Sequence, residues 1–189
     1  MPEHNQAAPG DLESVRSFIN TWSIPNETRV ATDTLPSLIN DPTAWQKHLS
    51  LPPLLPGDTL KKLLQLRDDL RAACENPDTA STLLNAWFSR VKLTAQVNSV
   101  AGTSSLVLKP ADATCITQIL AIVANAIASG DWPRLKTCGD CRWAFHDHTR
   151  NGSKRWCGMS KGGPDGRACG TIAKVNAFRS RAALKAHNE

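Results

Sequence analysis

Apolar side chains recur at helical spacing in four segments of the first 132 residues, and each segment starts near an aspartate that can cap a helix. The pattern predicts helices over residues 11–22, 58–74, 78–91 and 112–130. The last segment is the most apolar, so we expect it at the centre of the core; its apolar face carries Ile116, Ile119, Leu120, Val123 and Ile127. Residues 23–56 are rich in proline, which predicts loops with short helices around residues 35–39 and 43–49.

Two segments rich in strand-forming residues lie between the third and fourth predicted helices. They cover residues 92–97 and 105–109, and a turn containing Gly102 separates them. This arrangement predicts a β-hairpin. The expected fold of the N-terminal part is therefore mainly α with a small β-hairpin (α+β).

The charge of the chain is unevenly distributed. The 189 residues carry a net charge of +5 and are 41% hydrophobic, which is enough for one ordinary core and a small appendage. Residues 133–189 contain twelve Lys or Arg and four Asp or Glu, for a net charge of +8, whereas residues 1–132 have a net charge of −3. We therefore expect two domains, 1–132 and 133–189, and a polyanionic partner for the second, with nucleic acid as the first candidate.

The sequence predicts neither a signal peptide nor a membrane-spanning segment. Residues 1–10 are polar and contain Pro2 and Pro9, unlike a signal peptide. The most apolar run, residues 116–128, is interrupted by Thr117, Gln118 and Asn125, so it does not reach the ~18 apolar residues of a membrane span. We expect a cytoplasmic protein without a membrane partner.

Four of the six cysteines follow the pattern C-x2-C-x15-C-x11-C, at Cys138, Cys141, Cys157 and Cys169. A close pair can form a tight knuckle that presents two thiolates to one ion, and a distant pair completes a tetrahedron. Zn²⁺ suits four thiolates, so we predict one zinc ion per chain with these four cysteines as ligands. Cys74 and Cys115 stand singly in helical patterns and are expected to be buried, inert thiols.

Other uses of these cysteines fit less well. A thioredoxin-like redox pair needs a strand–helix context that this segment lacks, and disulfides are unexpected without an export signal. A catalytic zinc could use His146 or His148, but a deaminase-type site needs a glutamate, and residues 135–181 contain none. We expect the two histidines to be exposed strand residues and the zinc to be structural.

The cysteine segment predicts a treble-clef-like zinc module. We expect a knuckle at residues 138–141 and a hairpin that turns at Asn151-Gly152 and returns through residues 154–157. A helix should open near Cys169. So small a module has little core, so the metal should supply most of its folding free energy. The expected apolar cluster around the metal consists of Trp143, Phe145, Trp156 and Phe178.

Further motifs surround the cysteines, and their residues are Thr149-Arg150-Asn151-Gly152, Arg155-Trp156-Cys157 with Met159, Cys169-Gly170, Ala173-Lys174-Val175, Phe178-Arg179 and Arg181. This set resembles the CGNR zinc-finger family. Upstream, Phe18-Ile19-Asn20-Thr21 and Asp131-Trp132 resemble the ABATE domain that accompanies this finger in stress-induced transcription regulators. Together the two resemblances cover nearly the whole chain. They imply a bacterial regulator with a DNA-binding finger and a sensory N-terminal domain.

The chain departs from the family pattern at two places. The family signature continues Cys-Gly with Asn-Arg after the fourth cysteine, whereas this chain has Thr171-Ile172, so one expected cation is absent. The glycine-rich run of residues 160–168 also lengthens the spacing before Cys169.

Two groups of cations are the predicted nucleic-acid contacts, at the hairpin tip (Arg150, Lys154, Arg155) and along the last helix (Lys174, Arg179, Arg181, Lys185). At 100° per residue, Lys174, Arg181 and Lys185 fall within about 40° of one another, on a stripe that can face outward. The adjacent arc of Ile172, Val175, Phe178 and Ala182 is expected to pack on the knuckle.

We therefore expect a zinc-dependent transcription regulator that binds double-stranded DNA. RNA binding and a protein-interaction adaptor role are the alternatives. No enzyme is expected, because no nucleophile set, carboxylate pair or phosphate loop emerges. Asn20 and Thr21 are candidate ligand-binding residues for a small-molecule effector, with capping or buried hydrogen bonding as the alternative role. The sequence leaves open whether such an effector exists and whether the protein forms a homodimer.

Overall fold

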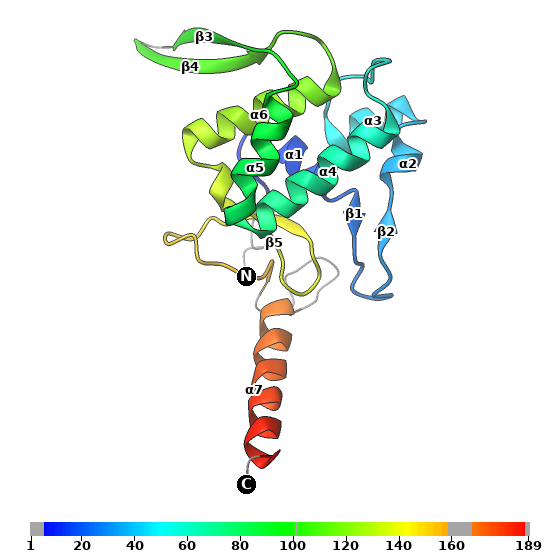
Figure 1. Ribbon diagram of the computed structural model, residues 1–189, viewed down its shortest axis with the longest axis vertical. Coiled ribbons are helices and arrows are strands. Elements are labelled where there is room, and N and C mark those ends of the chain that lie inside the picture. Colours follow the sequence, from blue (N-terminus) through cyan, green and yellow to red (C-terminus); the bar gives the residue numbers. More distant parts are fainter. Residues whose placement is uncertain (1–5, 101, 159–167, 188–189) are drawn as a thin grey trace.

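The computed structural model describes residues 6–100, 102–158 and 168–187, without the side chains of Val100 and residues 182–187. About half of the chain is helical, and the strands form small antiparallel pairs (Figure 1). This is the predicted fold class. The elements are α1 (Leu12–Ile19), β1 (Trp22–Ser23), β2 (Thr32–Asp33), α2 (Leu35–Leu38), α3 (Pro42–Leu49), α4 (Leu60–Glu75), α5 (Pro77–Phe88), β3 (Leu93–Val100), β4 (Thr103–Pro110), α6 (Cys115–Ser129), the 3-10 turn η1 (Trp132–Arg134), β5 (Leu135–Thr137), β6 (Ala144–His146) and α7 (Cys169–His187).

The body, residues 6–132, is built around α1, α4 and α6. Their apolar faces meet in one core, and the largest completely buried side chains include Phe18, Ile19, Leu63, Leu70 and Leu120. Ten of the fifteen residues of α6 are buried, so this helix lies at the centre as expected. The core continues into the C-terminal part, because Leu135 of β5 and Ala144 of β6 belong to the same buried cluster.

The N-caps of α4, α5 and α6 lie one or two residues away from the expected aspartates. The capping side chains are Thr59 for α4, Asn76 for α5 and Thr114 for α6. Asp58 does not cap its own helix. Its buried carboxylate accepts hydrogen bonds from the backbone N–H groups of Leu55, Cys115 and Ile116, so it closes the N-terminus of α6 from a different part of the chain.

The predicted hairpin of the body is confirmed. β3 and β4 pair antiparallel from Leu93 opposite Pro110 to Val100 opposite Thr103, and the hairpin projects from the body (Figure 1). The side-chain amide of Asn125 on α6 bonds both backbone groups of Leu108 and so fixes the base of the hairpin to the body.

The hairpin predicted to turn at Asn151-Gly152 is wrong, because its strands do not pair with each other. β6 pairs with β5, not with residues 154–157, so the two strands enclose the knuckle between them. Asn151-Gly152 lies in a turn with a Gly152 N–H to Thr149 carbonyl bond, but the returning segment is not a strand. The reason is local: the backbone N–H of Lys154 bonds to the carboxylate of Asp147 instead of a strand partner.

The C-terminal helix α7 begins at Cys169 as predicted and extends away from the rest of the molecule (Figure 1). Val175 and Phe178 leave 41% and 69% of their surface exposed, so the expectation that they pack on the knuckle is wrong. Only the first turn of α7 reaches the cysteines. Ala182 has its side chain outside the described residues. Among the described residues, no helix combines the length and apolarity needed to cross a membrane.

We predict that Asp58→Asn lowers the free energy of unfolding by about 2 kcal/mol, because the amide removes one acceptor oxygen and the negative charge at the start of α6. Urea denaturation followed by circular dichroism measures the change. Asp112→Asn is the matched control, since the Asp112 carboxylate also lies near the start of α6 but is exposed and does not bond to the N–H groups of Cys115 and Ile116. Equal losses in the two variants would contradict the assigned role of Asp58.

Candidate metal centre

The four predicted cysteines come together in the C-terminal part. The Sγ atoms of Cys138, Cys141, Cys157 and Cys169 all lie within 4.8 Å of one another, and all four residues are buried. Phe145 is buried beside them, and Trp143 and Trp156 pack around them. The expected apolar cluster is thus confirmed for these three aromatic residues and wrong for Phe178, which lies outside it.

The spacing of the sulfur atoms fits one tetrahedral zinc ion. The Sγ atom of Cys157 lies 3.6 Å from that of Cys141 and 3.7 Å from that of Cys169. Zinc–sulfur bonds of about 2.3 Å place the sulfurs of a tetrahedral site about 3.8 Å apart. A disulfide would need about 2.05 Å. The cysteines are therefore free thiols arranged as a closed four-sulfur site, and they can bind one zinc ion.

The four thiols differ in how readily they ionise, because each thiolate formed disfavours the ionisation of its neighbours. Hydrogen bonds from the thiols of Cys141 and Cys157 lower the pKa of Cys138. The same contacts raise the pKa of Cys141 and Cys157, and burial raises the pKa of Cys169. A bound divalent cation stabilises all four thiolates at once, so metal binding and deprotonation are coupled. Cys169 has further support, because it opens α7, where the helix dipole favours a negative charge.

The knuckle is held by its own backbone. The N–H of Cys138 donates to the carbonyl of Trp143, and the N–H of Arg142 donates to the carbonyl of Cys138. Arg142 has a φ of +62°, a left-handed conformation that is strained for a residue with a Cβ. An ion pair between Arg142 and Glu75 of α4 helps to hold this conformation.

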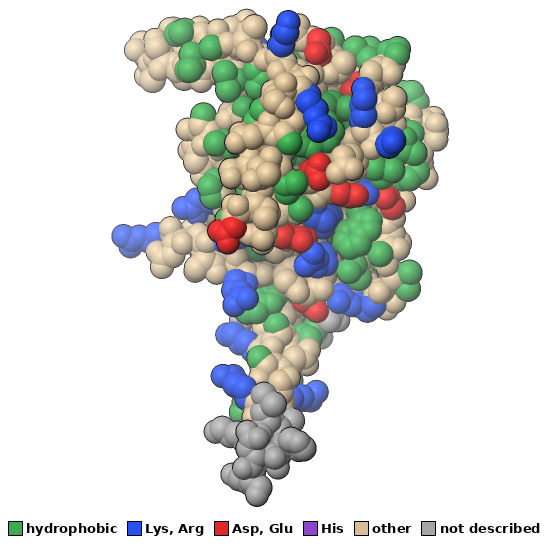
Figure 2. All heavy atoms as spheres, viewed as in Figure 1, with side chains coloured by type: hydrophobic (Ala, Val, Ile, Leu, Met, Phe, Trp, Pro, Cys, Tyr) green, Lys and Arg blue, Asp and Glu red, His purple; other side chains and the backbone are tan. Residues whose placement is uncertain are grey.

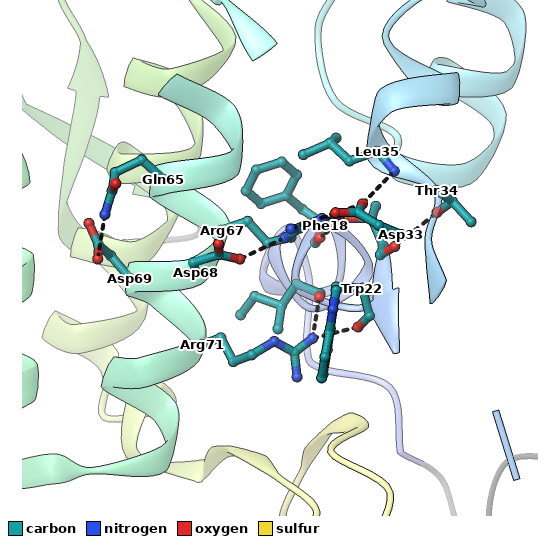
Figure 3. A network of polar contacts seen from close by, with 12 residues as sticks. Phe18, Trp22, Asp33, Thr34, Leu35, Gln65, Arg67, Asp68, Asp69 and Arg71 are labelled. Atoms are coloured by element: carbon teal, nitrogen blue, oxygen red, sulfur yellow. Dashed lines mark hydrogen bonds and ion pairs between the residues drawn. The ribbon is translucent and has the colours of Figure 1, made fainter. Parts of the chain in front are cut away.

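Arg71 of α4 fastens the knuckle to the body. Its buried guanidinium donates to the carbonyl of Ile19 at the end of α1 and to that of Trp22 in β1, and it stacks on the Trp22 ring (Figure 3). It also donates to the carbonyl of Arg142, and each of the three distances is 2.6 Å. Burial lowers the pKa of Arg71 to about 10, so the group stays charged at neutral pH. Sequence reasoning missed this residue. The apolar pattern of α4 gives no signal for it, because Arg71 lies about 100° around the helix from the mean direction of Leu63, Leu66 and Leu70.

Asn20 makes a second connection between body and knuckle. Its side-chain amide donates to the carbonyl of Ala144 and accepts from the N–H of Ala144, as a neighbouring β-strand would. The carbonyl of Gln6 accepts from the N–H of His146 on the same edge of β6. The outer edge of β6 is thus covered by the body.

Asp147 organises the loop between β6 and Cys157. Its buried carboxylate accepts hydrogen bonds from Lys136, from the backbone and hydroxyl of Thr149, and from the backbone of Lys154. Burial raises the pKa of Asp147, but these hydrogen bonds outweigh it and hold the pKa well below the usual range. The Arg134 guanidinium adds bonds to the carbonyls of Asp147 and Thr149. Sequence reasoning did not identify Asp147 or the two cations as structural.

The remaining predicted residues have varied surroundings. His146 is buried, not exposed as expected, and burial lowers its pKa. His148 is exposed, with Nε2 2.7 Å from the carbonyl of Ala7. Neither histidine belongs to the cysteine cluster. Thr21 donates to the carbonyl of Phe18, and with Asn20 it lines a hollow of about 350 Å³, but both side chains already have hydrogen-bond partners.

Cys74 and Cys115 stay outside the cluster. Cys115 is buried, and burial raises its pKa; Cys74 is half-buried, and burial raises its pKa to about 12. Both are neutral thiols at neutral pH, but only Cys115 is buried as expected.

The comparison with protein families agrees with the site. Residues 134–182 match the family model described as CGNR zinc finger. The match covers all four cysteines, the Asp147 loop and most of α7, and this part of the chain is called the finger below. No curated protein matches the chain. Where the CGNR signature has Asn-Arg, Thr171 of the finger is exposed and Ile172 is half-buried in the first turns of α7.

We predict one zinc ion per chain in native mass spectra of freshly purified, reduced protein, because four buried sulfurs match a closed zinc site. Cys169→Ser should weaken zinc binding by about 100-fold or more, since it removes one of four ligands. His148→Ala is the control and should retain the wild-type affinity. Metal-free protein, or the reverse order of the two variants, would contradict the four-cysteine site.

A further prediction concerns Arg71→Lys, which we expect to lower the free energy of unfolding by about 3 kcal/mol, because one ammonium group cannot bridge the carbonyls of Ile19, Trp22 and Arg142. Arg90→Lys is the matched control, since Arg90 also stacks on a tryptophan, Trp87, but is exposed. Chemical denaturation of the zinc-loaded protein measures both. A loss of unfolding free energy no larger than that of Arg90→Lys would disprove that Arg71 fastens the knuckle to the body.

Proposed function

We propose that the protein is a zinc-dependent transcription regulator that binds double-stranded DNA through the finger. The observation that carries the proposal is a basic hollow of about 570 Å³ between the Asp147 loop and α7. Its lining includes Arg150, Lys154, Arg155 and Lys174, and it includes no acidic residue. The hollow brings together members of both predicted groups of DNA-contacting cations. A concave surface with one sign of charge concentrates its field on a polyanion.

The cations of the finger form two groups, those that bond to neighbouring protein groups and those that line the basic hollow. Arg134, Lys136 and Arg142 bond to neighbouring protein groups, so they support the structure. Arg150, Arg155 and Lys174 are exposed, and Lys154 is half-buried with its ammonium group 5.4 Å from the centre of the Phe145 ring. The second group is the one available to phosphates.

The outward face of α7 extends the basic surface (Figure 2). The helix contains Lys174, Arg179, Arg181 and Lys185 and no acidic residue. Lys174, Phe178 and Arg181 fall within an arc of about 60° at 100° per residue. The exposed Phe178 ring therefore lies among cations, where it can contact a base edge while the cations contact phosphates. Lys185 keeps its place in the proposal from the sequence alone, since its side chain is outside the described residues.

Zinc binding leaves the field of the finger strongly positive. Four thiolates and one Zn²⁺ sum to −2, which lowers the charge of residues 133–189 from +8 to +6. Residues 1–132, with their charge of −3, add no attraction for DNA. In this proposal the body is an ABATE-like sensory domain, and the regulator acts in the cytoplasm.

We predict that the double variant Arg155→Ala, Lys174→Ala lowers the affinity for duplex DNA and reduces the slope of log affinity against log salt by roughly two, about one for each phosphate contact removed. Fluorescence anisotropy with a labelled duplex, repeated over a series of salt concentrations, measures both quantities. The double variant Lys47→Ala, Lys61→Ala is the control, because it removes two exposed cations from the body.

The alternatives give different results in the same assay. Unchanged affinity and slope in the Arg155, Lys174 variant would remove the basic hollow from the interface. Stronger competition by single-stranded RNA than by duplex DNA would favour the RNA-binding alternative, in which Trp156 of the hollow stacks on bases. Salt-insensitive binding to a protein partner, without DNA binding, would favour the adaptor alternative.

A further inference from the structure

A cavity of about 410 Å³ lies between α4, α5 and α6 and the η1 turn that leads into β5. It is separate from the cysteine cluster and from the basic hollow, and no sequence pattern indicated it. Its walls come from parts of the chain far apart in sequence, from Ala73 of α4 to Leu135 of β5. Its volume is within the usual range of small-molecule sites, about 300–1,000 Å³.

The lining of the cavity is apolar and uncharged. No Asp, Glu, Lys, Arg or His contributes to it, in contrast to the basic hollow beside α7. The polar side chains in the lining are Ser81 and Asn85 on the exposed face of α5 and the half-buried thiol of Cys74. Because burial raises the pKa of Cys74 to about 12, this thiol is neutral at neutral pH. A charged molecule would lose hydration in the cavity without gaining an opposite charge.

The cavity continues along the groove between α5 and α6. A second hollow of about 300 Å³ shares Phe88 and Ile127 with the first and reaches Leu93 and Leu108 at the base of the β3–β4 hairpin. Ile127 leaves 43% of its surface exposed here, which is unusual for a large apolar side chain of a central helix. The two hollows therefore adjoin each other, and together they extend from the η1 turn to the base of the β3–β4 hairpin.

We propose that this space is a binding site for one small, uncharged molecule with an elongated apolar body and a single group that hydrogen-bonds to Ser81 or Asn85. A small molecule fits better than a protein partner, because a stable protein interface needs about 800 Å² from each side and a polar rim. The cavity instead offers a few apolar walls with hydrogen-bonding groups at one edge, as small-molecule sites do.

The position of the site gives the bound molecule direct contact with the root of the finger. Trp132, Pro133 and Leu135 line the cavity, and Arg134 between them bonds to the Asp147 loop that carries the DNA-contacting cations. A molecule in the cavity thus contacts residues 132–135, and Arg134 of this segment bonds to the Asp147 loop. An effector role would rest on the proposed function, but the binding itself does not, so it is tested without DNA.

The experiment uses zinc-loaded, full-length protein and N-phenyl-1-naphthylamine, an uncharged elongated probe whose fluorescence rises in apolar surroundings. Ala80→Phe places a ring in the cavity, since Ala80 is a half-buried lining residue of α5. Ala86→Phe adds the same ring to the same helix, but Ala86 is exposed and lines neither hollow. Native mass spectrometry and thermal unfolding report the zinc content and the folding of each variant.

We expect saturable binding of the probe to the wild-type protein and to Ala86→Phe, and binding at least about tenfold weaker to Ala80→Phe. In the wild-type protein the probe should also slow alkylation of Cys74 by N-ethylmaleimide severalfold, followed on the Cys74 peptide by mass spectrometry. This second measurement locates the probe even if Ala80→Phe does not fold. No saturable binding, or binding that leaves the alkylation of Cys74 unchanged, would overturn the proposal. Loss of DNA binding alone would overturn only the proposed function.

Discussion

Mutual repulsion between the four thiolates of the buried cysteine cluster is the constraint on which the C-terminal part of the molecule depends. Their Sγ atoms lie within 4.8 Å of one another, and such a group can be fully ionised only around a cation. The knuckle, the Asp147 loop and the first turn of α7 each supply sulfur ligands or adjoin them. Because these segments share little apolar surface, the metal holds together what packing alone would leave apart.

The body also holds the finger in place. Arg71, Asn20 and Glu75 hold the backbone around Cys141 with hydrogen bonds and an ion pair, and Leu135 and Ala144 of the finger are buried in the core of the body. Cations are therefore used in two ways in one small region. Those with protein partners fix the geometry of the finger, whereas those in the basic hollow are exposed. Net charge alone does not distinguish the two uses.

The sequence predicted the features that depend on local spacing. The four cysteines, the start of α7 at Cys169, the central helix α6 and the β3–β4 hairpin all follow from patterns within short segments. The errors arose where distant groups compete. The prediction paired β6 with residues 154–157, whereas the N–H of Lys154 bonds to the carboxylate of Asp147 and β6 pairs with β5. Phe178 was placed in the core because one apolar arc of a helix looks the same whether it packs on protein or faces a partner.

The amide of Asn20 has a consequence for the evolution of such proteins. It occupies the open edge of β6 as a single-residue substitute for a strand, and Gln6 occupies the next position along that edge. A finger transferred by recombination to an unrelated body would carry its metal ligands with it but leave these edge partners behind. Its β6 edge would then be free to pair with another chain, and the hybrid would be prone to aggregate. Inheritance of the finger is thus tied to the end of α1, more than one hundred residues earlier in the chain.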